Sequence, residues 1–471
     1  MGRNYKIVEA VKTAVLALLS VSLVLLVIIY IGGTHIYQSM ISEQGKQPFD
    51  KLWSVQSDVD TDGIDSSRLI PELVGYKLAG SEPVGCISDG LAAAELYELV
   101  SPCLVELFGS GSKCAALDAS EGAMKMSQAA GSSEFVYLRY HEPVMYQMIY
   151  SYAAGKLIVA DGNTAVMGEG VESVYVSEII IVPDMEAQGH RFIALANDGA
   201  GGYFEFTRGD GVVDSVFFMS KLAAGAGSES SIATIGFGFA EDAQLSPTQP
   251  IFGAELETEQ ISSEPISLID SELDTALLRL FDYNPDKLDS YRDDSGVTYV
   301  NSRGRLRMSS GELIYQAGDP STGIRLEGLL GYSVDKALSL YDKLTAVDNI
   351  ISRLDDISHE LIGGEASLCL GEVYTEGGLL VFEYFYTYNN IRIMDAPAIR
   401  AVLSQDTLYS FELSAQSYKG SDKYELCPRQ SYVLRKLRES GELTDEDTDG
   451  RMRLVYRGGA AAWSVFFEGH E

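Results

Sequence analysis

The chain has 471 residues, of which 46% are hydrophobic and 10% aromatic, so it is long enough to bury the cores of two domains. Its 68 acidic residues outnumber its 35 basic residues and leave a net charge of −33. This balance excludes nucleic acid as a partner, because binding to phosphates needs clustered Lys and Arg. For the same reason, the charge of the chain as a whole disfavours anionic surfaces.

The first predicted element is an uncharged, apolar run near the N-terminus. Residues 14–33 read AVLALLSVSLVLLVIIYIGG, and thirteen of these twenty positions are Leu, Val or Ile. At about −0.3 to −0.6 kcal/mol each, these side chains favour insertion as a membrane-spanning helix. The alternative is a cleaved signal peptide, but its apolar core is about 7–15 residues long and precedes a small-x-small cleavage site. We therefore predict an uncleaved transmembrane anchor at residues 13–33, which lies in the lipid bilayer.

The charges that flank this run predict its orientation. Arg3, Lys6 and Lys12 precede it and are opposed by Glu9. The positive-inside rule then places residues 1–12 in the cytoplasm. No later segment is long and apolar enough to span the membrane again. The predicted localisation is the cell membrane, single-pass, with an extracytoplasmic C-terminal body.

A polar spacer is predicted at residues 34–68, before a first extracytoplasmic domain at residues 69–240. This domain begins with an apolar helical stripe, which Ser101-Pro102 interrupts. The interruption predicts either a kink or a new helix capped by Ser101. Strand-like runs rich in Tyr, Val, Ile and Phe follow at residues 134–150, 173–182 and 190–206.

Residues 241–268 contain three prolines and show no period, so we interpret them as an interdomain linker. A second extracytoplasmic domain is predicted at residues 269–471, with hairpins on both sides of a long helix. Hairpins beside segregated helices are typical of α+β folds. The predicted fold class is α+β, with a single N-terminal transmembrane helix followed by a two-domain extracytoplasmic body of antiparallel sheets with packed helices.

Two Asp-x-Asp-x-Asp-Gly stretches resemble the front half of a calcium loop. The candidate ligands are Asp58, Asp60 and Asp62 in the first stretch and Asp445, Asp447 and Asp449 in the second. A calcium loop needs a bidentate acid at its twelfth position, where this chain has Leu69 and Tyr456. The favoured interpretation is an acidic turn in each case. We predict no metal site and no cofactor.

Catalytic motifs are also incomplete. The sequence HELIG at residues 359–363 lacks the second His of a zinc-protease helix. Ser110-x-x-Lys113 has the spacing of an acylating pair, but Ser333-x-x-Lys336 has it too, inside a predicted helix, so the spacing is uninformative. We predict that the protein is not an enzyme.

The cysteines form no recognisable pattern. They are Cys86, Cys103, Cys114, Cys369 and Cys427. Their number is odd and no Cys-x-x-Cys occurs, so we interpret them as buried thiols. A disulfide between Cys103 and Cys114 is the alternative that an exported protein leaves open.

Four segments of the second predicted domain carry a resemblance to a known family. They are TYVNSRGRL at residues 298–306, GELIY at 311–315, a predicted helix at 333–357 and LVFEYFY at 380–386. Behind an N-terminal membrane helix, they resemble the YycH family of two-component-system regulators of Gram-positive bacteria and its relative YycI. The likeness is best over residues 297–400.

The resemblance implies a regulator that contacts a membrane sensor histidine kinase which controls cell-wall metabolism, with a paralogous regulator as a second partner. The anchor would then be a contact surface, and the small polar Ser20 and Ser22 are its candidate contact residues. The alternative is an extracytoplasmic enzyme or ligand-binding module that acts on cell-wall material. A pocket of convergent carboxylates would favour this alternative, and a groove or sheet edge without one would favour the regulator.

Overall fold

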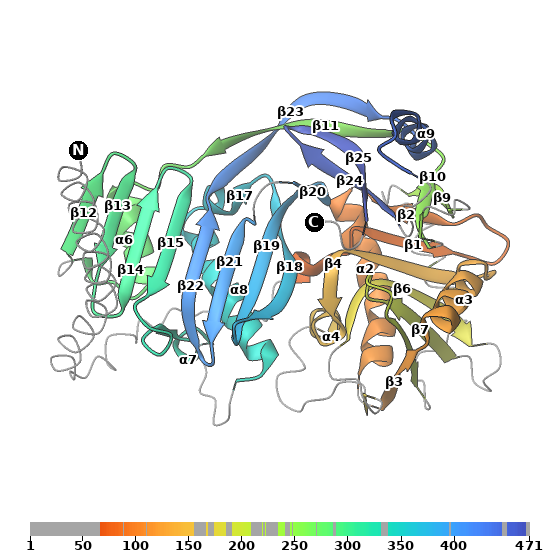
Figure 1. Cartoon of the computed structure of the whole chain (residues 1–471), viewed down its shortest axis with the longest axis horizontal. Helices are drawn as coiled ribbons and strands as arrows, with labels where there is room; N and C mark the ends of the chain where they lie inside the picture. The colour runs from red at the N-terminus through yellow and green to blue at the C-terminus, as the bar shows by residue number, and fades with distance from the viewer. Residues whose placement is uncertain are drawn as a thin grey trace, which may run out of the picture. The chain divides into compact units, whose positions relative to one another are not determined.

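Two large β-sheets and a narrow third sheet organise the chain (Figure 1). The computed structural model describes residues 66–467 except 88, 110, 155–165, 168–173, 185–190, 209–218, 220, 221, 223–233, 241–244, 247, 270, 286–288, 331–337, 395, 396 and 445–449. In this part of the chain, ten strands form the first sheet, twelve form the second and three form the third.

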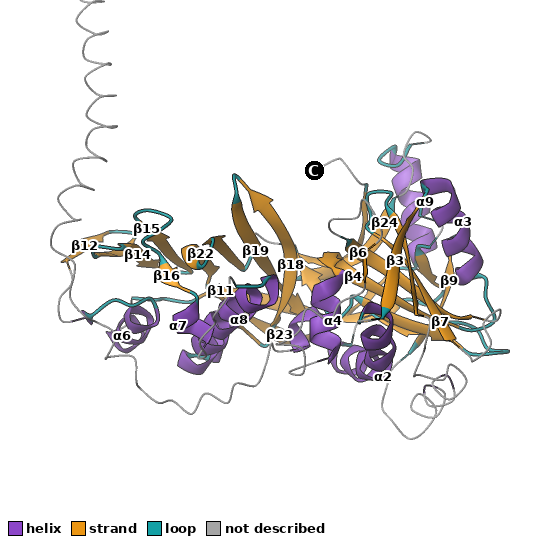
Figure 2. Ribbon diagram, turned by 90° about the horizontal axis from the view of Figure 1, so that it is seen from below, coloured by secondary structure: helices purple, strands orange, loops and turns teal. Residues whose placement is uncertain are grey.

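The first sheet is built from the N-terminal half of the body. Its strands, from one edge to the other, are β10 (Pro250–Phe252), β9 (Ile235–Phe239), β2 (Val84–Cys86), β1 (Leu73–Lys77), β4 (Phe135–Met145), β6 (Tyr175–Asp184), β7 (Arg191–Asn197), β8 (Tyr203–Arg208), β3 (Ser112–Leu117) and β5 (Val166–Met167). Helices α2 (Gly90–Phe108) and α4 (Tyr146–Ala154) lie on one side of these strands, and α3 (Ala119–Ala130) lies on the other (Figure 2). Strand β4 lies near the middle of the sheet and is buried along most of its length.

Helix α2 continues through Pro102 and is not divided into two helices. Its first turn is capped by Asp89, whose carboxylate accepts a hydrogen bond from the Ala92 amide at 3.0 Å. The Ser101 hydroxyl donates to the carbonyl of Tyr97 at 2.9 Å, so it does not cap a new helix. The second of the two alternatives for this segment is therefore wrong.

The second sheet is built from the C-terminal half of the chain. Its strands, in order, are β12 (Asp289–Asp293), β13 (Gly296–Val300), β14 (Gly304–Ser309), β15 (Glu312–Ala317), β22 (Thr407–Ser414), β21 (Ile399–Ser404), β19 (Leu379–Tyr388), β20 (Ile391–Ile393), β24 (Arg451–Arg457) and β25 (Ala460–Phe466), with β16 (Ile324–Arg325) on β22 and β18 (Ser367–Glu376) on β19. Helices α6 (Ser271–Leu280), α7 (Glu327–Leu330) and α8 (Leu340–Ile357) cover one face (Figure 2). Helix α8 begins with a capping box between Ser339 and Asp342.

The third sheet, which we call the ribbon, contains β11 (Leu256–Pro265), β23 (Gln416–Cys427) and the short β17 (Gly363–Gly364). Strands β11 and β23 pair antiparallel and lie across the top of Figure 1. The segment interpreted as a linker thus holds the edge strand β10 and the ribbon strand β11. Its irregular sequence reflects an exposed two-stranded ribbon, which needs no continuous apolar face.

The described body is mixed α+β with mainly antiparallel sheets. Residues Asp60–Glu471 group into one compact unit by their contacts. The division into domains at residues 241–268 stays a prediction. The predicted anchor, the cytoplasmic tail and most of the spacer lie outside the described residues, and no helix within those residues is long and apolar enough to cross a membrane.

All five cysteines are free and buried, as the interpretation of buried thiols requires. Burial raises the pKa of the Cys114 and Cys369 thiols to about 12. These thiols therefore stay protonated and unreactive at neutral pH.

Candidate functional site

The residues predicted from the sequence as metal ligands or partner contacts lie outside the part of the chain that the structure describes. Asp58, Asp60, Asp62, Asp445, Asp447 and Asp449 and the anchor residues Ser20 and Ser22 all lie outside it. Strand β24 begins directly after Gly450, where a helix would leave a calcium loop. Tyr456, at the twelfth position of that stretch, is 1% exposed, and its hydroxyl donates to the carbonyl of Glu259 at 2.7 Å.

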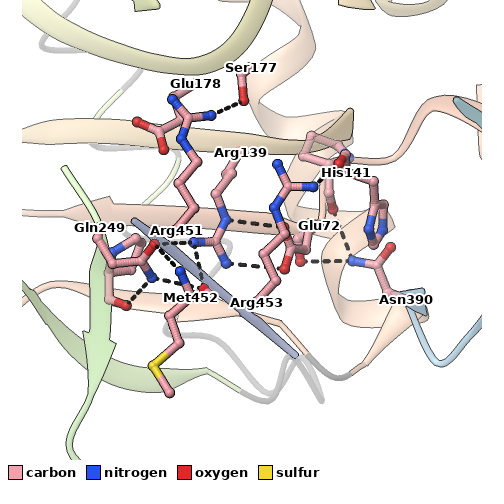
Figure 3. Close-up of polar contacts among 12 residues, drawn as sticks. Glu72, Arg139, His141, Ser177, Glu178, Gln249, Asn390, Arg451, Met452 and Arg453 are labelled. Carbon is pink, nitrogen blue, oxygen red and sulfur yellow. Dashed lines mark hydrogen bonds and ion pairs between the residues drawn. The ribbon is translucent and has the colours of Figure 1, made fainter. Parts of the chain in front are cut away.

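A buried group of polar side chains lies between the first sheet and β24, and we call it the junction cluster (Figure 3). Its charged members are Glu72, Arg139, Glu178, Arg451 and Arg453. They come from the start of β1, from β4, from β6 and from the C-terminal strand β24. The cluster thus joins segments that are more than 300 residues apart in the sequence.

The centre of the junction cluster is an ion pair between Arg139 and Glu72. The Nη2 atom of Arg139 donates to Oε1 of Glu72 at 3.1 Å, and its Nε lies 3.1 Å from Oε2. The two side chains are 0% and 2% exposed. A side-on pair of this kind, shielded from water, is strong but depends on both partners being present.

A second part of the cluster surrounds Arg451. Its guanidinium donates to the Ser177 hydroxyl at 2.6 Å and to the Asn197 side-chain carbonyl at 3.0 Å. Asn197 in turn donates to Glu178 at 2.9 Å, and Thr248 donates to the same carboxylate oxygen. The first residue of β24 is therefore bound to strands β6 and β7 of the first sheet.

The next residue of β24, Met452, pairs through its backbone with the side-chain amide of Gln249 in place of a neighbouring strand. Its Oε1 accepts from the Met452 amide at 3.0 Å, and its Nε2 donates to the Met452 carbonyl at 3.0 Å. The same Oε1 accepts from Arg139 at 3.3 Å. The backbone of β24 is thus satisfied by a side chain of the neighbouring sheet, as buried peptide groups require.

Arg453 and His141 complete the cluster on the side of β19 and β20. Arg453 donates to the His141 carbonyl and lies 4.0 Å from Glu72. The His141 ring packs edge-on against Phe385, with 5.3 Å between ring centroids. Asn390, from the turn between β19 and β20, donates to the carbonyls of Pro71 and Glu72 at 2.9 and 3.1 Å.

Burial and an excess of positive charge lower the pKa values of two basic groups in this region. Three arginines face two glutamates, so the cluster has one cation in excess. Burial lowers the pKa of Arg453 to about 10. Burial also lowers the pKa of His141 to about 4; Glu72 opposes this shift, and Arg453 and Arg392 add to it. His141 is therefore neutral at physiological pH.

A second buried network links η1 (Ser66–Leu69) to α8. Arg68 and Asp348 lie 3.1 Å apart, and their side chains are 6% and 3% exposed. The hydroxyls of Tyr384 and Tyr152 donate to Asp348 at 2.8 and 3.2 Å. Burial, followed by the charge of Asp348, raises the pKa of both tyrosines well above its ordinary value.

Replacing Tyr384 with phenylalanine tests the second network. The variant leaves Asp348 with one hydrogen bond fewer, so we expect the free energy of unfolding to fall by about 1.5–3 kcal/mol. Urea unfolding of the full-length protein measures the loss. The matched control is Tyr291→Phe, whose parent side chain is 68% exposed and whose change is expected to stay within about 0.5 kcal/mol. Equal effects of the two substitutions would contradict the assigned role of Tyr384.

A pocket of about 170 Å³ lies beside the junction cluster. Its lining includes Glu142, Glu372, Glu383 and Arg392. Arg392 pairs with Glu142, and Arg400 lies 3.4 Å from Glu383. Three carboxylates therefore line this pocket, and arginines pair with Glu142 and Glu383.

The junction cluster is suited to holding strands together. Its charged side chains are largely buried, and their partners are one another, backbone carbonyls and the neighbouring polar side chains of Ser177, Asn197, Thr248 and Gln249. The motif HELIG, for comparison, forms the short η4 (His359–Ile362), where the exposed His359 pairs with Asp355 at 2.6 Å. The cluster fixes β24 against the first sheet.

Comparison with known proteins gives one match to report. No protein-family model matches the chain, and no curated protein matches it. Among solved structures, the chain is similar to the crystal structure of YycH from Bacillus subtilis, with 13% sequence identity and a TM-score of 0.49 over 87% of this chain and 97% of that chain.

Proposed function

We propose that this protein is a membrane-anchored, extracytoplasmic regulator that modulates a sensor histidine kinase of a two-component system by protein contact. The observation that carries the proposal is the sealed junction cluster. The charged side chains of this cluster hold strands of the two sheets together, which supports a role in coupling the parts of a protein that acts by contact. The resemblance of residues 297–400 to the YycH family supports the class of partner.

An exposed edge strand of the second sheet, within the described residues, supports contact with another protein. Strand β12 is the outermost strand of the second sheet in the described part of the chain, and all five of its residues are exposed. Such an edge presents backbone donors and acceptors that a strand of a partner can pair with. A groove or a sheet edge without a cluster of convergent carboxylates favours the regulator over the enzyme alternative.

The junction cluster suits a regulator because it couples distant parts of the body. Strand β24 pairs with β20 of the second sheet and is bound through Arg451 and Gln249 to the first sheet. These buried contacts join the two sheets, so a displacement of one sheet would strain the contacts that it makes with the other. A partner bound at one surface can in this way act on the chain that leads to the anchor.

The test is in-cell cross-linking followed by identification of the membrane proteins that co-purify with the full chain. The native chain is compared with a variant whose residues 14–33 are replaced by an unrelated spanning helix. The proposal predicts that a histidine kinase is recovered with the native chain. Loss of the kinase with the substitute helix would locate the contact in the bilayer, and retention would locate it in the body. Recovery of no kinase with either chain would contradict the proposal.

A further inference from the structure

We infer that residues 66–72, which lead into the first strand of the body, form a strap that holds α4 against α8 and lets them separate when its front end is withdrawn. We call this stretch the entry strap. Helix α4 belongs to the half of the body built on the first sheet, and α8 to the half built on the second. The inference rests on the proposed function for its purpose, because the strap lies where the predicted anchor would act on the body.

The entry strap lies between the two halves. Its first element, η1, contacts β18 of the second half and α4 of the first half. In Figure 1, the red start of the coloured ribbon lies beside β18. Strand β1 of the first sheet begins directly after the strap, at Leu73. A displacement of the N-terminal chain therefore reaches the strap before it reaches either sheet.

Arg68 binds the front end of the strap to α8. Its guanidinium lies 3.1 Å from Oδ1 of Asp348. It also donates to the Asp348 carbonyl and to the Ser352 hydroxyl, both at 3.2 Å. The side chains of Arg68 and Asp348 are only 6% and 3% exposed, so water does not replace this contact while the strap is in place.

The rear end of the strap is bound by Asn390, from the turn between β19 and β20. Its side-chain amide donates to the carbonyls of Pro71 and Glu72 at 2.9 and 3.1 Å. The Glu72 carboxylate also pairs with Arg139 of the junction cluster. The second half thus holds both ends of the strap, although the strap leads into a strand of the first half.

Asp348 connects the front end of the strap to both halves. Its Oδ1 accepts a hydrogen bond from Tyr384 on β19 at 2.8 Å, and its Oδ2 accepts one from Tyr152 on α4 at 3.2 Å. The bond from Tyr152 joins α4 directly to α8. Withdrawal of Arg68 removes the cation that lies 3.1 Å from this carboxylate, so it acts on the joint itself.

The two ends of the strap differ in what their release leaves behind. When Arg68 leaves, the Asp348 carboxylate keeps two tyrosine donors, and water that enters to solvate its charge separates α4 from α8. When Glu72 leaves, the buried Arg139 loses its ion-pair partner. The front end therefore opens first, and the junction cluster stays closed as a pivot. A minor open state of about 0.1–10% is sufficient for a partner to select.

The experiment measures the distance between the two halves in the full-length protein. Glu98 on α2 and Asp356 on α8, both exposed, are changed to cysteine and spin-labelled, since the native thiols are buried. Pulsed electron paramagnetic resonance in lipid nanodiscs then gives the distribution of distances between the labels. We expect one narrow distribution for the native strap. The variant Arg68→Met should add a second, longer distance, because it removes the cation but keeps a long side chain.

Two comparisons separate the strap from a general loss of stability. Arg305→Met removes an arginine from an exposed position of β14 and should leave the distribution narrow. The double variant Arg68→Met/Asp348→Asn should return most of the population to the short distance, because no buried carboxylate charge is left to solvate. Hydrogen exchange in Arg68→Met should become about tenfold faster in α4, while β1 and β24 keep their protection.

Three outcomes would overturn the inference. They are an unchanged distance distribution in Arg68→Met, equal broadening in Arg305→Met, and hydrogen exchange that becomes faster to the same extent across the whole body. The last result would make Arg68 a source of global stability only. None of these measurements involves a kinase, so the strap can fail while the proposed partner stands, and recovery of no kinase in cells would leave the strap in place.

Discussion

Replacing Glu72 with glutamine is expected to lower the free energy of unfolding by about 3–5 kcal/mol. The substitution keeps the shape of the side chain but removes one of the two acids of the junction cluster. Three buried arginines would then face Glu178 alone, and Arg139 would lose its ion-pair partner at 3.1 Å. Uncompensated charge in a site that is 0–2% exposed is costly, because water cannot replace the lost partner.

The matched comparison is Arg139→Met in the same full-length protein. This variant leaves two arginines and two glutamates, so the remaining charges balance and we expect a smaller loss than for Glu72→Gln. The double variant should lose less than the sum of the two single variants, since the residues interact directly. Urea unfolding measures all three. An Arg139→Met loss larger than that of Glu72→Gln would contradict the assigned charge imbalance.

Acid is expected to destabilise the protein through His141. Its pKa is about 4 in the folded state, below the ordinary value of 6.5. The unfolded state therefore binds more protons between these two pH values. The contribution of His141 is fully present above pH 6.5 and is lost as the pH falls toward 4, by about 3 kcal/mol in total.

The control for His141 is a glutamine at the same position, which is neutral at every pH. The free energy of unfolding is measured for both proteins at pH 7, 6, 5 and 4. We expect the difference between native protein and His141→Gln to shrink or reverse steadily below pH 6.5, because only the native protein must keep an imidazole unprotonated. A difference that does not change with pH would show that His141 is not held neutral in the folded state.

The sequence predicted local structure well where patterns are regular. Hairpins are predicted on both sides of a long helix, and the one formed by β19 and β20 turns at Asn389-Asn390, where both asparagines take positive φ, at 49° and 63°. The helix predicted at residues 333–357 is confirmed over Leu340–Ile357, and its buried residues include Leu344, Val347 and Ile351. Hairpin turns and the buried face of a helix depend on residues that are close in the sequence, so the spacing of apolar residues predicts them.

The junction cluster could not be assembled from the sequence, because Arg139 pairs with Glu72 across 67 residues and with the Met452 carbonyl across 313 residues. A signal was nevertheless present. Arg139 interrupts the strand FVYLRYH and Glu178 interrupts VYVSEIIIV, and a charge at the centre of an apolar strand must find a partner inside the fold. The pattern predicts that partners exist, but the topology decides which acid meets which arginine.

The ribbon contains a strand that the sequence pattern does not reveal. Residues 256–265 read LETEQISSEP, whose acidic and polar composition suggested a linker, yet they form β11. Their strand state comes from pairing with β23 along a register that runs from Leu256 with Cys427 to Pro265 with Gln416. A ribbon strand of this kind is stabilised mainly by pairing with its partner strand. Its own sequence therefore shows little of the apolar–polar alternation from which strands are predicted.

Hydrogen exchange on the full-length protein and its Glu72→Gln variant tests most directly the central claim, that the junction cluster clamps β24 to the first sheet. The account predicts that amide protection falls together in β4 and in β24, whereas β13 and β14, far along the second sheet, keep theirs. Loss of protection confined to β4, with β24 unchanged, would contradict the claim. In that case the buried charges would stabilise the first sheet alone and would not couple it to the C-terminal strand.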